Sequence, residues 1–334
     1  MGTARTLVTG SAGHLGEALM RVLRGSGEDA VGLDLKRTPF TDRVGSITER
    51  RFVRECIRNV DVVLHTATLH KPHIATHTRQ AFIDTNITGT LNLLEEAVAA
   101  GAKSFVFTSS TSVFGHSLRP AEGEPARWIT EELAAQPRNI YGVTKLAAEQ
   151  LCELVHRKNA LPCVVLRTSR FFPEEDDDRV ARETYLADNL KVNEFLHRRA
   201  DIADVASAHI LAARKAPEIG FGRYIVSATT PFDRGDLQQL RSDPSSVVGR
   251  HVPEFESVYS QRGWTMPPGI ERVYVNERAR TALGWRPTYD FAYVMKLLGR
   301  SEDYRSALAQ SIGSKGYHAE RFAEGPYPIE KSQM

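Results

Sequence analysis

The sequence predicts a doubly wound α/β fold, in which helices cover both faces of a parallel β-sheet, with a smaller C-terminal substrate lobe. Two observations predict it: short apolar runs alternate with helical patterns, and a glycine-rich turn follows the first run. We assign the apolar runs to strands buried on both faces; they are Thr6–Thr9, Ala30–Leu35, Asp61–Thr66, Ser104–Thr108, Cys163–Leu166 and Arg223–Ser227. The helical patterns are Leu15–Leu23, Leu91–Ala100 and Ala147–His156. Such alternation is typical of right-handed crossovers between parallel strands.

The regular alternation stops after Arg167, which indicates a division of the chain. Residues 171–182 contain Pro173 and the acidic run Glu174–Asp178, a composition typical of a loop. We therefore expect a first domain, the dinucleotide-binding part, of residues 1–170, to which residues 200–228 return. The smaller lobe would consist of residues 171–199 and 229–334. With 334 residues, the chain is long enough to bury a full core.

The charge balance and the cysteines exclude several classes of protein. Lys and Arg number 43 against 41 Asp and Glu, a net charge of +2, which does not indicate a nucleic acid partner. Cys56, Cys152 and Cys163 lack metal-ligand spacing, so we expect reduced thiols in the core. We find no signal region and no apolar stretch long enough to span a bilayer, and therefore expect no membrane contact and a cytoplasmic location.

The first strand leads into a turn with three glycines, directly before a helix. One glycine permits the tight turn, one lets the backbone approach a pyrophosphate, and one lets the helix pack on the strand. The free amides at the helix start then face the phosphates, as in a Rossmann dinucleotide site. Within this turn we expect cofactor contacts from Gly10, Ala12, Gly13, His14, Leu15 and Gly16.

Asp34 stands at the end of the second strand, where a dinucleotide's adenosine ribose would lie. A carboxylate at this place accepts hydrogen bonds from both ribose hydroxyls and repels a 2′-phosphate. Asp34, with Leu35 beside it, therefore predicts NAD rather than NADP. Lys36 and Arg37 follow and leave two alternatives open: a phosphate contact that would favour NADP, or a solvated basic turn.

Tyr141 and Lys145 stand four residues apart at the start of a predicted helix, a spacing that puts both side chains on one face. A free tyrosine has a pKa of about 10 and is a poor base near neutral pH. A nearby lysine cation lowers that pKa, and the same lysine can hold the nicotinamide ribose. Together the two residues predict acid–base catalysis of a hydride transfer.

Hydroxyl residues end the strand Ser104–Thr108 and continue from Ser109 to Ser112. One of these hydroxyls would lie beside Tyr141 across the carboxyl edge of the sheet, where it can polarise the substrate oxygen. We assign this role to Ser110, so the predicted catalytic residues are Ser110, Tyr141 and Lys145. For Ser109 and Ser112 we expect only a strand end capped by hydroxyls.

With these motifs, nearly the whole chain resembles the extended short-chain dehydrogenase/reductases, the NAD-dependent epimerase/dehydratase family. The family's pattern also appears in Leu64–Ala67, Asn86–Leu94, Ala203–Val205 and Leu283–Pro287. The resemblance implies cofactor contacts from Thr66, Ala67 and Thr68, and an approach of Thr108 and residues 167–169 to the nicotinamide. It also implies a homodimer through the helices near Leu91–Ala100 and Lys145–His156.

The same resemblance implies where the substrate binds, and we expect contacts from Thr68, His70, Ser110, Thr111, Ser169 and Arg170. Sugar-nucleotide dehydratases of the family carry Asp-Glu after the catalytic hydroxyl. Thr111 and Ser112 stand at these positions here, which disfavours a 4,6-dehydratase.

Arg170 stands where the family's sugar-nucleotide epimerases usually carry an asparagine, and residues 173–204 are few for a loop that holds uracil or guanine. In this respect the chain is similar to uronate dehydrogenases, which oxidise a free sugar acid. Arg170 would then pair with a substrate carboxylate. The alternative is a surface arginine that balances the charges of Glu174–Asp178.

His70, His73 and His77 lie in a predicted loop and helix start without accompanying carboxylates. We expect no metal there, and instead a contact of His70 or His73 with the substrate.

The expected protein is an NAD-dependent oxidoreductase that moves a hydride to or from a hydroxyl- or keto-bearing carbon of a sugar or sugar-derived molecule. A net dehydrogenase and a nucleotide-sugar 4-epimerase with tightly held NAD both remain open. A non-catalytic NAD-sensing binding protein is a third alternative, which the intact Ser110, Tyr141 and Lys145 disfavour.

Overall fold

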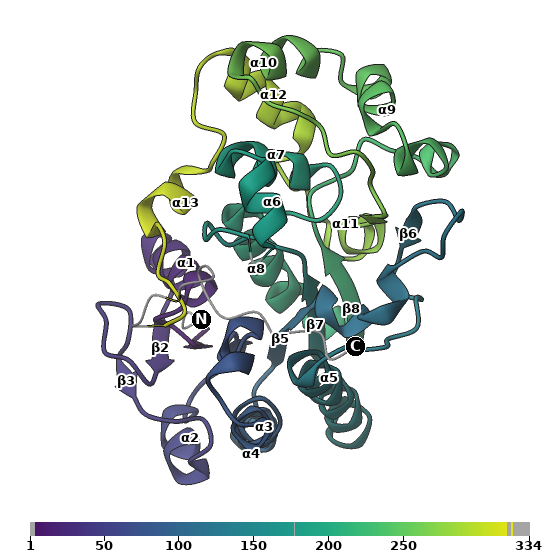
Figure 1. Cartoon of the computed structure of the whole chain (residues 1–334). Helices are drawn as coiled ribbons and strands as arrows, with labels where there is room; N and C mark the ends of the chain where they lie inside the picture. The colour runs from purple at the N-terminus through teal and green to yellow at the C-terminus, as the bar shows by residue number, and fades with distance from the viewer. Residues whose placement is uncertain (1–3, 177, 319–321, 323–334) are drawn as a thin grey trace.

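The computed structural model describes residues 4–176, 178–318 and 322. Its main element is a seven-stranded sheet in the order β3-β2-β1-β4-β5-β7-β8 (Figure 1). All neighbouring strands pair in parallel, which confirms the predicted fold class. The strands are β1 Thr6–Thr9, β2 Ala30–Asp34, β3 Arg43–Val44, β4 Val62–His65, β5 Ser104–Ser110, β7 Cys163–Thr168 and β8 Phe221–Val226.

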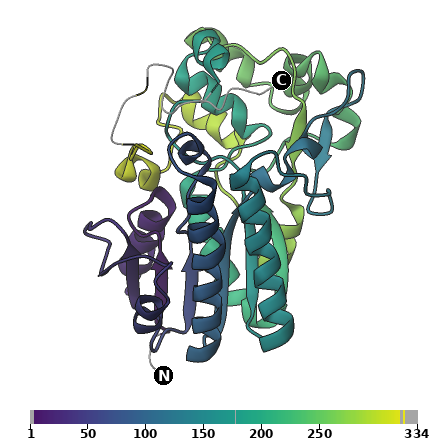
Figure 2. The same ribbon diagram turned by 60° about the horizontal axis from the view of Figure 1, so that its bottom comes forward.

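Helices cover both faces of this sheet (Figure 2). One face carries α1 His14–Gly25, α8 Ile202–Ile219, α11 Glu277–Leu283 and α13 Ala307–Ile312. The other face carries α2 Arg50–Cys56, α4 Gly89–Ala100 and α5 Ile140–Asn159, with α3 Arg79–Ile83 and the π-helical turn η2 Asp84–Thr88 before α4. Within β1, Val8 packs toward the first set and Leu7 toward the second, because successive side chains of a strand point to opposite faces.

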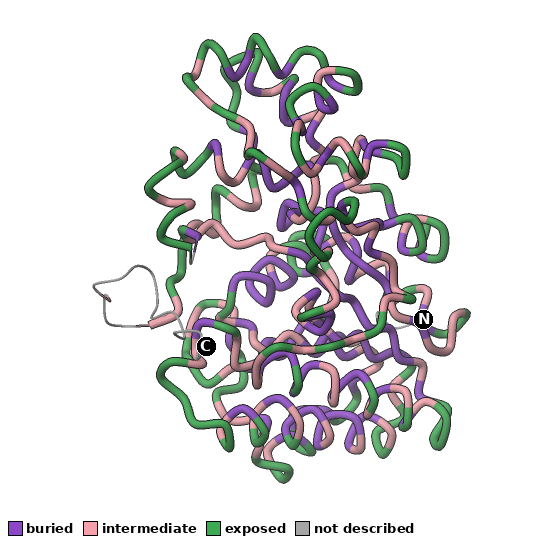
Figure 3. Tube along the Cα trace, turned by 45° about the vertical axis from the view of Figure 1, so that its right-hand side comes forward, coloured by how far each residue is buried: buried purple, intermediate pink, exposed green. Residues whose placement is uncertain are grey.

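The smaller lobe has a core of its own, which contains Phe195, Val248, Phe255 and Phe291. Its helices are α6 Arg179–Thr184, α7 Ala187–Phe195, α9 Pro244–His251, α10 Phe255–Arg262 and α12 Phe291–Gly299. Buried stretches of the chain run through the interior of both parts, and exposed residues lie along the outer helices and loops (Figure 3).

A second, two-stranded parallel sheet pairs β6 Arg127–Ile129 with β9 Arg272–Tyr274. β6 therefore lies with the smaller lobe, although the sequence placed all of residues 1–170 in the first domain. In the opposite sense, Leu283 and Trp285 are buried in the core of the main sheet. The predicted boundaries do not follow the packing at these two places, because strand pairing and burial join segments that are distant in sequence. Residues 319–321 and 323–334 of the predicted lobe, and residues 1–3 of the predicted first domain, lie outside the described residues.

The three cysteines are buried and form no disulfide, at the end of α2, within α5 and at the start of β7. Within the described ranges, no helix is both long and apolar enough to cross a bilayer. The register of the strands brings four strand ends together. Thr9 pairs with His65, His65 with Phe107, and Ser110 with Thr168. The loops after β1, β4, β5 and β7 therefore meet at one edge of the sheet.

Candidate active site

The glycine positions of the turn after β1 have no room for a side chain. Gly10 has φ +73°, and a Cβ there would lie 2.7 Å from the amide nitrogen of Ala67. A Cβ on Gly16 would lie 1.9 Å from the carbonyl oxygen of Gly10. Gly13 is the N-cap of α1 and has no side chain to accept from the first amides of the helix. These amides are left for an anion, as a dinucleotide pyrophosphate requires.

Asp34 lies directly beside this turn. The amide of Ala12 donates to Asp34 Oδ2 at 3.0 Å, and the amide of Lys36 donates to Oδ1 at 2.9 Å. The side chain of Leu15 is buried in the core, so only its backbone could contact a cofactor, whereas the side chain of Leu35 is exposed. The position of Asp34 fits the predicted ribose contact, which stays a prediction.

The loop after β4 is fixed to β1 by hydrogen bonds. Thr66 Oγ1 donates to the carbonyl oxygen of Thr9 at 2.7 Å, and the amide of Ala67 donates to Thr9 Oγ1 at 3.3 Å. Thr68 Oγ1 donates to Asn86 Oδ1 at 3.0 Å. The three residues predicted to line the cofactor thus lie at the edge of the sheet next to the glycine turn.

Asn86 joins this loop to the helix that carries Tyr141. The residue is buried in the π-helical turn η2, and its Nδ2 donates to the carbonyl oxygen of Leu69 and to Thr144 Oγ1, both at 3.0 Å. Asn86 begins the family motif Asn86–Leu94, but no individual role was predicted for it from the sequence. That motif was the signal that could have identified it.

The three predicted catalytic residues come together at this edge. Asn139 Oδ1 accepts a hydrogen bond from the amide of Gly142 at 3.0 Å and caps α5, whose first turn bears Tyr141. The hydroxyl of Ser110, the last residue of β5, lies near the phenol of Tyr141. Tyr141 is 3% exposed and Lys145 2% exposed. The catalytic roles predicted for them stay predictions.

Burial dominates the electrostatics of this trio. It raises the pKa of Tyr141 to about 12, against the lowering effect of the hydrogen bond with Ser110. It lowers the pKa of Lys145 to about 7, and Lys145 Nζ lies 4.2 Å from the centre of the Phe107 ring. The lowered tyrosine pKa expected from the sequence is therefore not found in this structure, because desolvation of the phenol outweighs the opposing effect.

Two residues expected near the nicotinamide direct their side chains elsewhere. Arg167 is buried and forms an ion pair with Glu149, with Arg167 Nη2 2.8 Å from Glu149 Oε2. The same carboxylate has a second partner, because Ser109 Oγ donates to Glu149 Oε1 at 2.5 Å. Ser109 was expected only to cap a strand end, and it also joins β5 to α5. Thr108 Oγ1 lies 2.8 Å from His209 Nε2 on α8. Only the backbone of Arg167 remains available for the expected approach.

A cavity of about 180 Å³ lies next to the catalytic trio. All predicted substrate residues except Thr68 line it; they are His70, Ser110, Thr111, Ser169 and Arg170. Phe172, Glu174 and Tyr317 also line it and were not predicted. Tyr317 is distant in sequence from every motif, and no sequence signal pointed to it.

Unpaired polar atoms are buried beside this cavity. The His70 ring lies 4.9 Å from the Tyr141 ring, and burial lowers the pKa of His70 to about 3, so the ring is neutral. His70 Nδ1 and Ser169 Oγ have no hydrogen-bond partner among the described residues. Because buried polar groups are normally paired, these atoms indicate a place where a polar ligand binds.

Arg170 forms ion pairs within the protein. Its Nη1 lies 3.0 Å from Glu194 Oε1 and also contacts Asp176 Oδ2. Burial alone would raise the pKa of Glu194, but the guanidiniums of Arg170, Arg199 and Arg198 hold it well below its ordinary value. Asp176 belongs to the acidic run Glu174–Asp178, so this contact fits the alternative of an arginine that balances those charges, and the pairing of Arg170 with a substrate carboxylate stays a prediction.

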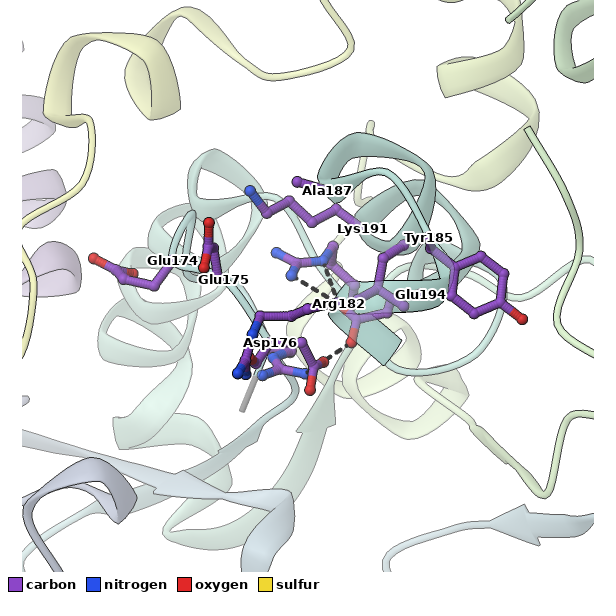
Figure 4. Close-up of a pocket in the computed structure, with 11 residues that line it drawn as sticks. Glu174, Glu175, Asp176, Arg182, Tyr185, Ala187, Lys191 and Glu194 are labelled. Atoms are coloured by element: carbon purple, nitrogen blue, oxygen red, sulfur yellow. Dashed lines mark hydrogen bonds and ion pairs between the residues drawn. The ribbon is translucent and has the colours of Figure 1, made fainter. Parts of the chain in front are cut away.

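These ion pairs line a second cavity, of about 280 Å³, which adjoins the first through Arg170, Glu174 and Glu175. Glu194 lies on its wall, where dashed lines mark its interactions (Figure 4). The carboxylate of Glu174 points away from this cluster (Figure 4).

Comparison with known proteins identifies the family. Residues 6–224 match the NAD dependent epimerase/dehydratase family. The chain belongs to this family. It is therefore an NAD-dependent oxidoreductase, as the sequence predicted.

Individual relatives are similar over most of their length. The chain is 25% identical over 325 residues to a UDP-glucose 4-epimerase of Streptomyces lividans, covering 86% of this chain and 92% of the relative. It is 24% identical over 331 residues to a 3-beta-hydroxysteroid dehydrogenase of Mycolicibacterium neoaurum, covering 85% and 87%. A short-chain dehydrogenase/reductase superfamily protein from Agrobacterium tumefaciens, solved with bound NAD, has the same fold, with a TM-score of 0.64, 23% identity and coverage of 92% of this chain and 99% of that one.

Proposed function

We propose that this enzyme moves a hydride between NAD and a hydroxyl- or keto-bearing carbon of a sugar-type substrate, with Tyr141 as the acid–base group. The observation that carries the proposal is the joint position of Ser110, Tyr141 and Lys145 between the cavity and the strand ends that follow the glycine turn. A binding protein without catalysis would not need these three groups together.

The residues divide the chemistry among them. When bound at the glycine turn, Asp34 and the loop after β4, NAD supplies the hydride acceptor or donor. Ser110 orients the substrate oxygen, and Tyr141 takes the hydroxyl proton on oxidation or returns it on reduction. A pKa of about 12 keeps the phenol protonated at neutral pH, which suits the reductive direction. A protonated Lys145 would favour the phenolate that the oxidative direction needs.

The cavity supports a small polyhydroxylated substrate. Hydroxyls of Ser110, Thr111 and Ser169 line it, and its volume of about 180 Å³ is below the 300–1,000 Å³ usual for larger ligands. A sugar acid, which the sequence favoured, has less support because Arg170 is already paired. The adjoining cavity of about 280 Å³ leaves room for a longer substrate.

A nucleotide-sugar 4-epimerase with retained NAD is the second candidate. It is supported by the similarity to the Streptomyces lividans enzyme, whereas the similarity to the Mycolicibacterium neoaurum enzyme supports a net dehydrogenase. The two differ in one observable: a dehydrogenase releases NADH, and an epimerase does not accumulate it. Nucleotide sugars, neutral sugars and sugar acids should therefore be tested in parallel, with NADH absorbance and product stereochemistry as readouts.

On the substrate found in this way, Tyr141→Phe should lower kcat about 10³-fold, because general acid–base catalysis contributes roughly 10²–10⁴-fold. NAD binding, measured by calorimetry, should persist. Tyr293→Phe, at a phenol on α12 away from the cavity, is the matched control and should behave as wild type. Near-normal turnover by Tyr141→Phe would refute the assignment.

The homodimer stays a prediction, as does the cytoplasmic location. Val143 and Leu154 on α5, one of the helices expected at the interface, are 46% and 44% exposed. Exposed apolar side chains on this helix support the dimer. A monomer in sedimentation velocity would contradict it.

A further inference from the structure

After α13 the chain runs over α1 (Figure 1), and further along, Tyr317 lines the cavity beside Ser110. We call residues 313–318 the C-terminal strap. Its backbone turns sharply at Gly313, with φ +62°. The amide of Lys315 lies 3.2 Å from His14 Nε2, and Lys315 Nζ forms an ion pair with Glu17 one turn further along α1. The strap thus contacts the helix whose first amides face the cofactor phosphates.

Glu174 anchors the strap from the other side. Ser314 Oγ donates to Glu174 Oε1 at 3.0 Å, and the amides of Lys315 and Gly316 donate to the same oxygen at 3.1 Å. His14 Nε2 lies 3.0 Å from it. Burial alone would raise the pKa of Glu174, but the interactions led by His14 lower it to about 2.

The end of the strap reaches the catalytic tyrosine through one intervening ring. Tyr317 stacks on His70 with the ring centres 5.6 Å apart and the planes at 3°. His70 in turn lies against Tyr141. Beyond Tyr317, His318 Nε2 lies 3.1 Å from the carbonyl oxygen of Pro72. The strap therefore spans the site from α1 to the loop after β4, the two elements between which a dinucleotide would extend.

The strap forms one wall of the pocket through Tyr317, and buried polar groups beside this wall are unpaired. Tyr141 and Lys145 are almost fully buried. His70 Nδ1, Ser169 Oγ and Glu174 Oε2 have no hydrogen-bond partner in the described part of the chain. Burying such groups without partners is unfavourable, so the closed arrangement gains stability when a ligand supplies those partners.

We propose that the C-terminal strap is part of the catalytic site: it closes the pocket over the bound cofactor, places Tyr317 as one wall, and lifts before NAD enters or leaves. The inference rests on the proposed function in one respect, namely that the nicotinamide binds beside Ser110 and Tyr141. The strap would then bind the cofactor from residues 313–318, far along the chain from the glycine turn and the catalytic residues.

The test is the exchange kinetics of NADH, followed by stopped-flow fluorescence on the full chain without substrate. Tyr317→Ala should raise both the association and the dissociation rate about tenfold, which corresponds to about 1.4 kcal/mol and to the usual contribution of an aromatic pair. Tyr317→Phe keeps the ring and should retain the wild-type rates. Tyr293→Ala makes the same substitution on α12, outside the strap, and should change neither rate.

Glu174→Ala is a second, independent variant, because it removes the anchor and leaves Tyr317 in place. It should raise both rates in the same direction, and circular dichroism would verify that both variants fold. Unchanged rates in Tyr317→Ala and Glu174→Ala would overturn the proposal. A faster dissociation with an unchanged association rate would also overturn it, since the strap would then only contact the cofactor. NADH exchange is measured without turnover, so failure of the strap proposal is distinguishable from failure of the proposed function.

Discussion

Two buried clusters of polar side chains lie next to each other in this enzyme and differ in how completely they are paired. In the first, Glu149 accepts hydrogen bonds from Ser109 and from the guanidinium of Arg167. In the second, Ser110 contacts Tyr141, while Lys145 lies over an aromatic ring with its pKa lowered by burial. Ser109 and Ser110 are consecutive residues, and Lys145 and Glu149 are one turn apart on α5.

The difference shows what burial does to a charged group in each setting. Glu149 lies on the side of α5 that faces β5 and β7, where Ser109 and Arg167 contact it. Tyr141 lies at the end of α5, beyond the strand ends, where the neighbouring space is a cavity. Removing one partner from a fully paired buried group destabilises the fold, whereas a buried group that lacks partners keeps its capacity to bind and to exchange protons.

The largest expected effect is the loss of stability when the fully paired Glu149 is removed. Glu149→Ala should lower the free energy of unfolding by about 3–5 kcal/mol, because it leaves the Arg167 guanidinium buried and unpaired. Glu153→Ala is the matched control, since Glu153 lies one turn further along α5, is partly exposed and pairs with Arg223. It should cost less than about 1 kcal/mol. Chemical denaturation measures both, and equal losses would remove the distinction between the clusters.

A smaller effect concerns pH. The pKa of Lys145 falls from 10.5 to about 7 on folding. Between these values the unfolded chain binds more protons than the folded chain, so stability rises with pH. From about pH 7 to about pH 9, wild type without cofactor should gain about 2 kcal/mol more than Lys145→Met. Parallel stability curves for the two proteins would show that Lys145 is not desolvated as the structure indicates.

The smallest effect compares the two serines directly. Ser109→Ala should cost about 1.5 kcal/mol of unfolding free energy, the usual value for a hydrogen bond to a charged group, and should leave turnover near normal. Ser110→Ala should cost less stability and reduce kcat/KM. Denaturation and steady-state kinetics on the same two variants show which serine supports stability and which supports turnover. If Ser110→Ala left turnover intact, Ser110 would belong with Ser109 in the structural cluster.

The sequence could predict the features that depend on local pattern. The glycines at positions 10, 13 and 16 each meet a steric demand within one turn, and the spacing of Tyr141 and Lys145 is a property of a single helix. The strands were predictable because a parallel sheet buries both faces of each strand. These elements were enough to predict which edge of the sheet binds the cofactor.

The rest depends on contacts between distant segments, which leave no local signal. Arg170 was expected either to meet a substrate carboxylate or to balance the acidic run Glu174–Asp178, and α7 adds Glu194 as a further partner. Arg167 was expected near the nicotinamide, but α5 presents Glu149. Tyr317 reaches His70 only because α13 packs on α1 and directs the chain across the pocket. The tyrosine pKa also depends on desolvation, which the residue spacing does not reveal.

The pairing of β6 with β9 has a consequence for anyone who wishes to exchange substrate specificity between relatives. The chain leaves the main sheet after β5, contributes β6 to the smaller lobe, and returns for α5 before that lobe is otherwise begun. A chimera joined near residue 170 would therefore take β6 from one parent and β9 from the other, so the two strands of this sheet would no longer come from one sequence. A working graft has to carry residues 115–138 together with the C-terminal half.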